Sequence, residues 1–206
     1  GPRTHPPCRA ALQARQKGAR LFLFDAPDGP LEGALPFERT AHDDAELFAL
    51  MEEVLVPAFG ARNAVVADTR DAGGDIAAAL AGDARIVFLI NDMRAFMQAV
   101  YSPDLQMSDF MEIALQKGNQ HKIQFFAAVT PDDYADTVRY AAMRIFAGYG
   151  RGIHLGCMFD QQSILRFPLS AADAVRQLPP GVAYAAAGGE TVRLITPCVK
   201  EVCTHE

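Results

Sequence analysis

Two polar residues follow an apolar run near the middle of the chain. The run from Arg85 to Ile90 leads directly into Asn91 and Asp92. This is the pattern of a strand on which many ATP-hydrolysing proteins carry a magnesium-binding aspartate. An amide can hydrogen-bond to water but has no negative charge, so Asn91 lacks the usual means of holding the metal. Taken alone, the segment also fits a core strand that ends in a turn.

ATP hydrolysis of this type also needs a loop that surrounds the phosphates. The loop ends in Gly-Lys-Ser or Gly-Lys-Thr, because backbone amides and a lysine bind the phosphates while the hydroxyl holds magnesium. No lysine of this chain is followed by Ser or Thr; the lysines are Lys17, Lys117, Lys122 and Lys200. Two separate requirements fail, so we predict a disabled nucleotide site with no catalytic residue and no cofactor on this chain.

Other kinds of site are not expected from the composition. The formal net charge is -6 with no basic block, so a nucleic acid would meet net repulsion. The spacing of Cys198, Cys203 and His205 matches no common zinc pattern, and we expect no metal. The scattered cysteines favour reduced thiols of an intracellular protein over a disulfide framework. No run approaches the roughly 20 apolar residues that span a bilayer.

Strand-like and helix-like segments alternate along the chain. Nearly continuous apolar runs predict strands at 21–25, 85–91, 123–129 and 152–159, with a further short strand at 64–68. Helical patterns occupy 43–59, 109–117 and the stretch from Thr130 to about Gly148. A hairpin is predicted at 182–187 and 191–197. This order predicts an α/β fold in three layers, with a mainly parallel sheet, helices on both faces and a C-terminal β-hairpin.

The domain organisation is expected to be simple. Residues 1–19 would comprise a tag-cleavage scar, Gly1-Pro2, and a lead-in helix. Residues 20–206 would form a single domain that lacks a recognisable P-loop. Of the histidines, His121 lies at a predicted helix-to-strand turn and is expected to be solvated, whereas His154 lies inside an apolar strand and is expected in the core.

Several short motifs together resemble one family. They are Gly152-Ile-His-Leu155 with Gln161 and Gln162 beyond it, and the stretches 91–101, 107–134 and 179–197. The set resembles the FtsK/SpoIIIE family of ring-forming motor ATPases. More narrowly, it is similar to the last, degenerate ATPase-like domain of EssC-type membrane proteins that drive type VII secretion. The resemblance implies a P-loop-NTPase-like sheet, with Asn91 and Asp92 at the Walker B positions and Gln161 or Gln162 at the γ-phosphate sensor position.

The same resemblance implies a function and a location. The expected function is a noncatalytic module of a secretion motor that acts in substrate recognition or in regulation of neighbouring ATPase domains. Its partners would be secreted proteins and those domains, in a ring, at the cytoplasmic side of the bacterial membrane as part of a membrane-anchored parent that could bind ATP and magnesium. The alternatives are an active ATPase domain whose P-loop lies outside this chain, and an unrelated α/β ligand-binding domain.

An apolar cluster follows the Walker B-like strand and could bind a partner. Its members are Met and aromatic residues, which suit binding surfaces: Phe96, Met97, Tyr101, Met107 and Phe110. We expect some of these side chains to be exposed as a docking patch. Burial in the core is the alternative, and the C-terminal hairpin is the next candidate surface.

Overall fold

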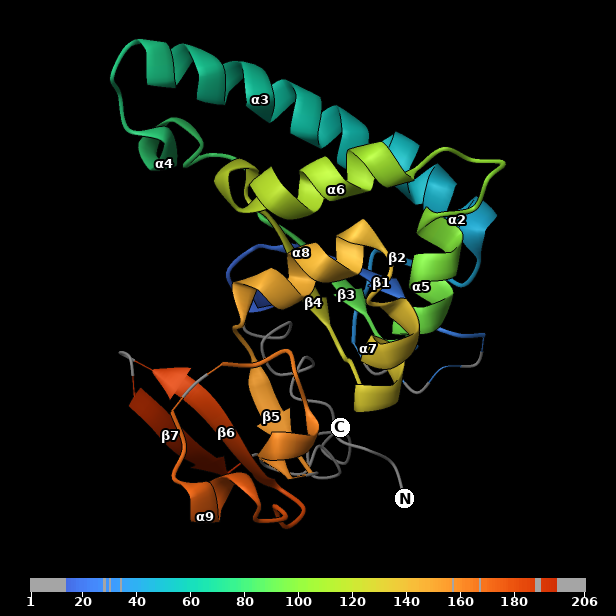
Figure 1. Cartoon of the computed structure of the whole chain (residues 1–206). Coiled ribbons are helices and arrows are strands. Elements are labelled where there is room, and N and C mark those ends of the chain that lie inside the picture. The colour runs from blue at the N-terminus through green and yellow to red at the C-terminus, as the bar shows by residue number, and fades with distance from the viewer. Residues whose placement is uncertain are drawn as a thin grey trace, which may run out of the picture.

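A four-stranded parallel sheet forms the centre of the molecule (Figure 1). The computed structural model describes residues 14–27, 29, 31–33, 35–156, 158–166, 168–187 and 190–195. The strand order is β2-β1-β3-β4, with β1 at Arg20–Phe24, β2 at Arg39–Ala41, β3 at Ile86–Ile90 and β4 at Ile123–Ala127. Phe24 is in register with Ile90, and Ile90 with Ala127. The carboxyl ends of β1, β3 and β4 therefore lie at one edge of the sheet.

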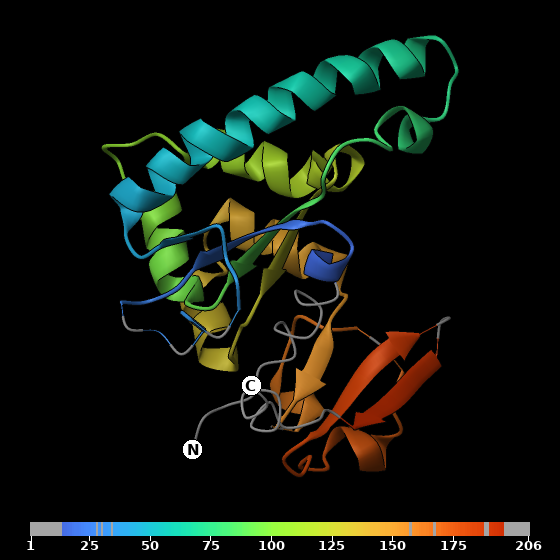
Figure 2. The same cartoon turned by 180° about the vertical axis from the view of Figure 1, so that it is seen from behind.

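Strands β1 and β3 are buried on both faces, as their continuous apolar runs predict, whereas the edge strand β4 is only partly buried, contrary to the expectation for 123–129. In β1, Phe22 and Phe24 face a large cluster formed with the helices, whereas Leu21 and Leu23 face a smaller one. Figure 1 shows the helices stacked over the first face, and Figure 2 looks onto the second from behind. In the described residues, the second face packs against side chains that include Leu31, Leu35 and Phe37.

The helices follow the strands in alternation, which confirms the α/β fold. Those of the main layer are α2 (Asp44–Leu50), the π-helical turn η1 (Met51–Leu55), α3 (Val56–Asp71), α4 (Ile76–Ala79), α5 (Met93–Val100), α6 (Ser108–Lys117), the 3-10 turn η2 (Gly118–His121), α7 (Pro131–Thr137) and α8 (Ala141–Tyr149). None of the helices in the described ranges is both long and apolar enough to cross a bilayer.

The helical segment that begins at Asp43 is longer than the sequence pattern indicates. Asp43 caps it by accepting a hydrogen bond from the Glu46 backbone N–H at 2.8 Å. The helix does not end near Pro57; the proline lies in the first turn of α3, directly after the π-helical turn η1, and the helix continues to Asp71. The strand predicted at 64–68 is wrong: these residues belong to α3, with Val66 buried and Val65 38% exposed, as on a helix surface.

A second sheet lies below the first in Figure 1. It is antiparallel, with the order β5-β6-β7, and contains β5 (Ile153–Leu155), β6 (Val182–Ala187) and β7 (Glu190–Ile195), accompanied by the 3-10 turn η3 (Phe159–Gln161) and the short helix α9 (Ala171–Ala174). The predicted hairpin is confirmed as β6 and β7. The strand predicted at 152–159 is shorter and pairs with β6 rather than with the parallel sheet. It ends before Gly156, whose φ of 82° leaves the extended conformation.

Candidate functional site

The carboxyl edge of the parallel sheet brings together polar side chains from two neighbouring strands. Asn91 directly follows β3 and Asp25 directly follows β1, and the two strands are paired in register. The Asn91 Nδ2 donates a hydrogen bond to Asp25 Oδ1 at 2.8 Å. The ends of parallel strands are where α/β proteins usually bind ligands, so this pair marks the candidate site.

Asp25 is the carboxylate of this edge, but it points inward and is covered. It is only 1% exposed. Besides Asn91, its oxygens accept hydrogen bonds from the backbone N–H groups of Ala26 at 2.9 Å and Leu31 at 3.4 Å. A Cβ built on Gly29 would lie 2.2 Å from the Asp25 carboxylate, so the loop after β1 passes directly over it. Only glycine fits this close approach.

This arrangement does not suit a hydrated magnesium ion. Magnesium is bound through carboxylate oxygens that can reach it together with waters and phosphates. The Asp25 oxygens already accept bonds from three protein donors, and Asn91 directs its amide N–H at Asp25. Within the described part of the chain, no three His, Cys, Asp or Glu side chains come together as metal ligands. Cys198, Cys203 and His205 lie outside the described residues.

Asp92, beside Asn91, is the N-cap residue of helix α5. Its Oδ1 accepts a hydrogen bond from the Ala95 backbone N–H at 2.9 Å, which caps the N-terminus of α5. A capping aspartate satisfies a backbone donor that would otherwise be unpaired. Both candidate Walker B side chains therefore make specific bonds within the domain, Asn91 to Asp25 and Asp92 to the helix.

His42 adds an ionisable group near the same edge. Its Nδ1 lies 3.1 Å from the Asp25 backbone oxygen, and its Nε2 lies 3.5 Å from Glu32 Oε1. Burial opposes the charged form, but the hydrogen bond to Asp25 and the carboxylates of Glu32 and Glu46 outweigh it and raise the pKa of His42 above its ordinary value. The sequence did not lead us to Asp25, His42 or Glu32, although Asp25 ends its strand as Asn91 does.

The glutamines expected near the phosphate sensor lie beside the second sheet. Gln161 ends η3 and is exposed. Gln162 organises its own loop: its Oε1 accepts from the backbone N–H groups of Ile164 at 2.9 Å and Leu165 at 2.6 Å, and its Nε2 donates to the Leu165 oxygen. Because β5 is not part of the parallel sheet, the strand before these residues does not bring them to its carboxyl edge.

The apolar cluster after β3 is core rather than a docking patch. Phe96, Met97 and Met107 are 0% exposed. The Phe96 ring makes edge contacts with Phe24 at 5.4 Å between centroids, because α5 lies against the helix-covered face of the sheet. The expected exposure of these three residues is wrong.

The other two members of the cluster, Tyr101 and Phe110, are half-buried and pack against the core. Tyr101 Oη donates to Glu112 at 2.7 Å and accepts from the Ala142 N–H at 2.8 Å. Burial and the bond to Glu112 raise the pKa of Tyr101 to about 12, so it stays a neutral link between helices.

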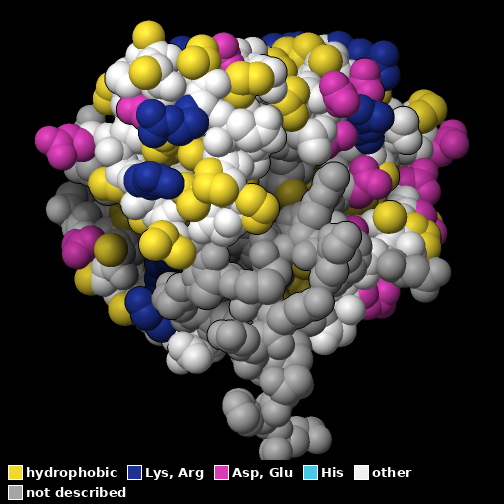
Figure 3. Space-filling view, turned by 90° about the horizontal axis from the view of Figure 1, so that it is seen from below, with side chains coloured by type: hydrophobic (Ala, Val, Ile, Leu, Met, Phe, Trp, Pro, Cys, Tyr) yellow, Lys and Arg dark blue, Asp and Glu magenta, His cyan; other side chains and the backbone are white. Residues whose placement is uncertain are grey.

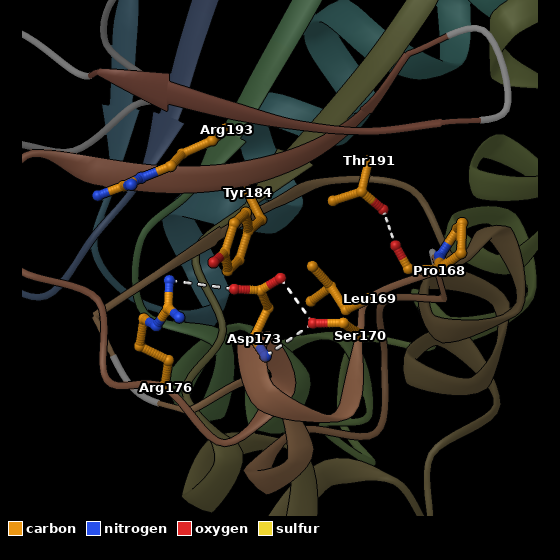
Figure 4. Close-up of a pocket in the computed structure, with 8 residues that line it drawn as sticks. All are labelled: Pro168, Leu169, Ser170, Asp173, Arg176, Tyr184, Thr191 and Arg193. Atoms are coloured by element: carbon orange, nitrogen blue, oxygen red, sulfur yellow. Dashed lines mark hydrogen bonds and ion pairs between the residues drawn. The ribbon is translucent and has the colours of Figure 1, made fainter.

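The C-terminal hairpin, the next candidate surface, borders a pocket of about 300 Å³ (Figure 4). Tyr184 and Thr191 come from the hairpin, and Ser170 and Asp173 from the segment around α9. Three polar side chains of the pocket bind one another: Asp173 accepts a hydrogen bond from Ser170 Oγ at 2.7 Å and forms an ion pair with Arg176 at 3.1 Å. On the face seen from below (Figure 3), hydrophobic side chains are scattered among charged ones.

Comparison with known proteins identifies the fold. No protein-family model and no curated protein matches the sequence. The cytoplasmic domain of EssC superposes with a TM-score of 0.67 at 14% identity, over 92% of this chain and 36% of that one. ATPases 2 and 3 of EssC from Geobacillus thermodenitrificans give a TM-score of 0.59 at 15% identity, over 89% of this chain and 32% of that one.

A third structure, ATPases 2 and 3 of EccC from Thermomonospora curvata in complex with a signal sequence peptide, gives a TM-score of 0.59 at 15% identity, over 86% of this chain and 30% of that one. The chain therefore spans about a third of the length of these structures. At such identities the likeness establishes architecture alone, and the chain shares the fold of part of the EssC cytoplasmic domain and of ATPases 2 and 3 of EssC and EccC.

Proposed function

We propose that this chain is a noncatalytic ATPase-like module of a type VII protein secretion motor. The observation that carries the proposal is the hydrogen bond from Asn91 to the buried Asp25. At the strand end where a motor ATPase needs a carboxylate facing magnesium, this chain has an amide, and the neighbouring carboxylate is bound by the protein itself. The absence of Gly-Lys-Ser or Gly-Lys-Thr from the sequence supports the same proposal.

The module would act by binding proteins. Its partners would be secreted substrates or adjacent ATPase domains of a membrane-anchored parent, in a ring at the cytoplasmic side of the bacterial membrane. A structure with this fold, EccC, was solved in complex with a signal sequence peptide, which supports a role in substrate recognition. Loss of hydrolysis does not remove the fold, so a disabled motor domain can keep its binding surfaces.

The test is an assay of magnesium-dependent ATP turnover and of nucleotide binding by the purified chain. We expect neither, and we expect Asn91→Asp not to restore turnover, because the phosphate-binding loop remains missing. Turnover above background that is lost on Asp92→Ala would refute the proposal. A rate gained in Asn91→Asp would mean that another segment of the chain binds the phosphates.

One observation favours a second candidate, an active ATPase domain whose P-loop lies outside these residues. β4 is an edge strand of the parallel sheet, and the backbone groups of Phe125 that point away from β3 have no partner among the described residues. Phe126 on the same strand is 40% exposed. An open edge can pair with a further strand. Photolabelling of this domain by azido-ATP in the full-length parent, abolished by Asn91→Ala, would favour this candidate over the noncatalytic one.

A further inference from the structure

A second hollow lies at the amino-terminal edge of the parallel sheet, at the opposite ends of the strands from Asp25 and Asn91. Its volume is about 540 Å³. Arg70 comes from the end of α3, Arg85 directly precedes β3, and Lys122 directly precedes β4. The short helix α4, beside the end of α3 in Figures 1 and 2, forms one wall. Segments distant in sequence thus bring three cations to one hollow.

The three cations bind only neutral acceptors. Arg70 Nη2 donates to Gln120 Oε1 at 3.2 Å, and Arg85 Nη1 donates to Gln124 Oε1 at 3.3 Å. Lys122 Nζ donates to the backbone oxygens of Ala81 at 3.2 Å and Asp83 at 3.1 Å. Among the described side chains, none of the three cations forms an ion pair with a carboxylate. Their positive charge is therefore available to a ligand.

Two of the acids near the hollow bind other groups. Asp83 lies 3.6 Å from Arg62 Nε, and Asp75 accepts from the Ala77 N–H as the cap of α4. The Lys122 ammonium is held by two carbonyls of the turn before β3. In a chain of net charge -6, a fixed positive hollow is a local exception to the overall field.

The apolar wall and the openness of the hollow restrict the ligand. Ile76, Ala77 and Leu80 line it beside the cations. Of its walls only Leu80 is buried, whereas Arg70, Arg85 and Ala77 are exposed. Small-molecule sites enclose most of their ligand, so an open hollow suits a segment of a larger partner better. A long polyanion such as nucleic acid would extend beyond the hollow into the field of an acidic protein.

We propose that this hollow binds an acidic peptide segment of a partner protein. Carboxylates of the segment would pair with the guanidinium groups of Arg70 and Arg85, which can form paired N–H···O bonds. An apolar side chain of the segment would pack on Ile76 and Leu80. This site is independent of nucleotide chemistry, since it lies at the other edge of the sheet, and it does not rest on the proposed motor function.

The experiment measures fluorescence anisotropy of a labelled Glu-Glu-Leu-Glu-Glu peptide with the whole chain. We expect saturable binding that weakens as salt is added, because exposed charges are screened. The double variant Arg70→Glu/Arg85→Glu should weaken binding at least about tenfold. The control Arg193→Glu reverses the charge of one exposed arginine on β7, outside the hollow, as each single substitution of the pair does, and should change affinity less than about twofold.

Further variants and ligands test whether the loss of binding comes from charge or from misfolding, and whether the hollow prefers a peptide to other anions. Arg70→Lys/Arg85→Lys keeps the charge but loses paired hydrogen bonds, so its affinity should lie between those of the wild type and the Glu variant. The proposal fails if a Gln-Gln-Leu-Gln-Gln peptide binds equally well, if Arg193→Glu has the effect of the double variant, or if no saturable binding occurs. It also fails if a thymidine oligonucleotide binds more tightly at the same residues.

Discussion

The two edges of the parallel sheet treat their charged side chains in opposite ways. At the carboxyl edge, Asp25 is 1% exposed and accepts hydrogen bonds from Asn91 and from two backbone N–H groups. At the amino edge, Arg70 and Arg85 are exposed and bind only neutral amide oxygens. Position at a strand end therefore does not decide whether a charge can act on a ligand; the donors and acceptors around it do.

The loops explain this difference. After β1 the chain passes over Asp25 so closely that Gly29 has no room for a side chain, and the loop supplies donors of its own. Before β3 the chain turns so that the Ala81 and Asp83 carbonyls accept from Lys122, while Arg70 and Arg85 lie on the surface.

Asp25→Ala should be strongly destabilising. The substitution leaves the Asn91 amide and the N–H groups of Ala26 and Leu31 without their acceptor in a buried place. We expect the free energy of unfolding to fall by about 2–4 kcal/mol, measured by urea denaturation. Asp92→Ala is the matched control on this edge and should cost only about 1 kcal/mol, as for other lost helix caps. Equal losses in the two variants would contradict the central role given to Asp25.

Asn91→Asp should convert a favourable pair into a repulsive one. A carboxylate at position 91 would lie against Asp25, and like charges at this distance oppose each other. We expect a loss of about 1–3 kcal/mol at neutral pH. The loss should shrink on acidification, because the repulsion raises the folded-state pKa of the introduced carboxyl and one proton relieves it.

The control for this charge effect is the exchange variant Asp25→Asn/Asn91→Asp, which restores one donor and one acceptor. It should recover part of the stability lost in Asn91→Asp. If the single variant is as stable as the wild type over the whole pH range, the hydrogen bond between Asn91 and Asp25 does not contribute to stability as argued from its burial.

Much of the fold follows from local sequence. Strands buried on both faces need continuous apolar runs, which 21–24 and 86–90 supply; the run at 123–127 also forms a strand, but one that is only partly buried. The hairpin follows from two β-rich runs around Gly-Gly-Glu, and the position of Asn91 at a strand end follows from the run before it. These features depend on neighbouring residues, so the sequence pattern was sufficient to predict them.

The predictions that were wrong depend on contacts between residues that are far apart in the sequence. The apolar run at 152–159 is compatible with a strand of the parallel sheet and with a strand that pairs with β6. Its pairing with Ala183 and Tyr184 places it in the second sheet, and this pairing is not visible in the local sequence. His121 was expected to be solvated, but it is 1% exposed. Its ring stacks on the ring of Phe59, from the distant helix α3, with 4.1 Å between the centroids. The expected core position of His154 is confirmed, since it is 4% exposed.

The same limit affected the candidate site. Phe96 and Met97 have the composition of either a core or a docking surface, and burial depends on where α5 packs. Asp25 was missed although it ends an apolar run as Asn91 does, because the run alone does not show that two strand ends are hydrogen-bonded to each other. The cations of the amino edge converge from three separate segments, so no local motif predicted their hollow.

His42 should make the carboxyl edge sensitive to pH to a small extent. Its pKa is raised in the folded protein, so its contribution is complete below the ordinary histidine pKa and is lost as the pH rises through the raised value. His42→Gln should therefore be less stable than the wild type by about 0.5–1 kcal/mol at low pH, with the difference vanishing at high pH. Thermal unfolding between about pH 5 and pH 9 measures it. A difference that grows with pH would reverse the assigned sign.

Arg85→Ala should have the smallest effect, because the amino edge does not use this charge for stability. Arg85 is exposed, and its described hydrogen bond, to the side-chain oxygen of the partly buried Gln124, lies at the surface. We expect the free energy of unfolding to change by less than about 0.5 kcal/mol in urea denaturation. Arg62 provides the contrast at the same edge: it is 7% exposed and donates to the backbone oxygens of His121 at 2.7 Å and Ala84 at 2.6 Å. Arg62→Ala should cost at least about 2 kcal/mol, because one buried and one partly buried acceptor lose their donor. If Arg85→Ala were as costly as Arg62→Ala, the cations of the hollow would be structural, and the contrast between the two edges of the sheet would not hold.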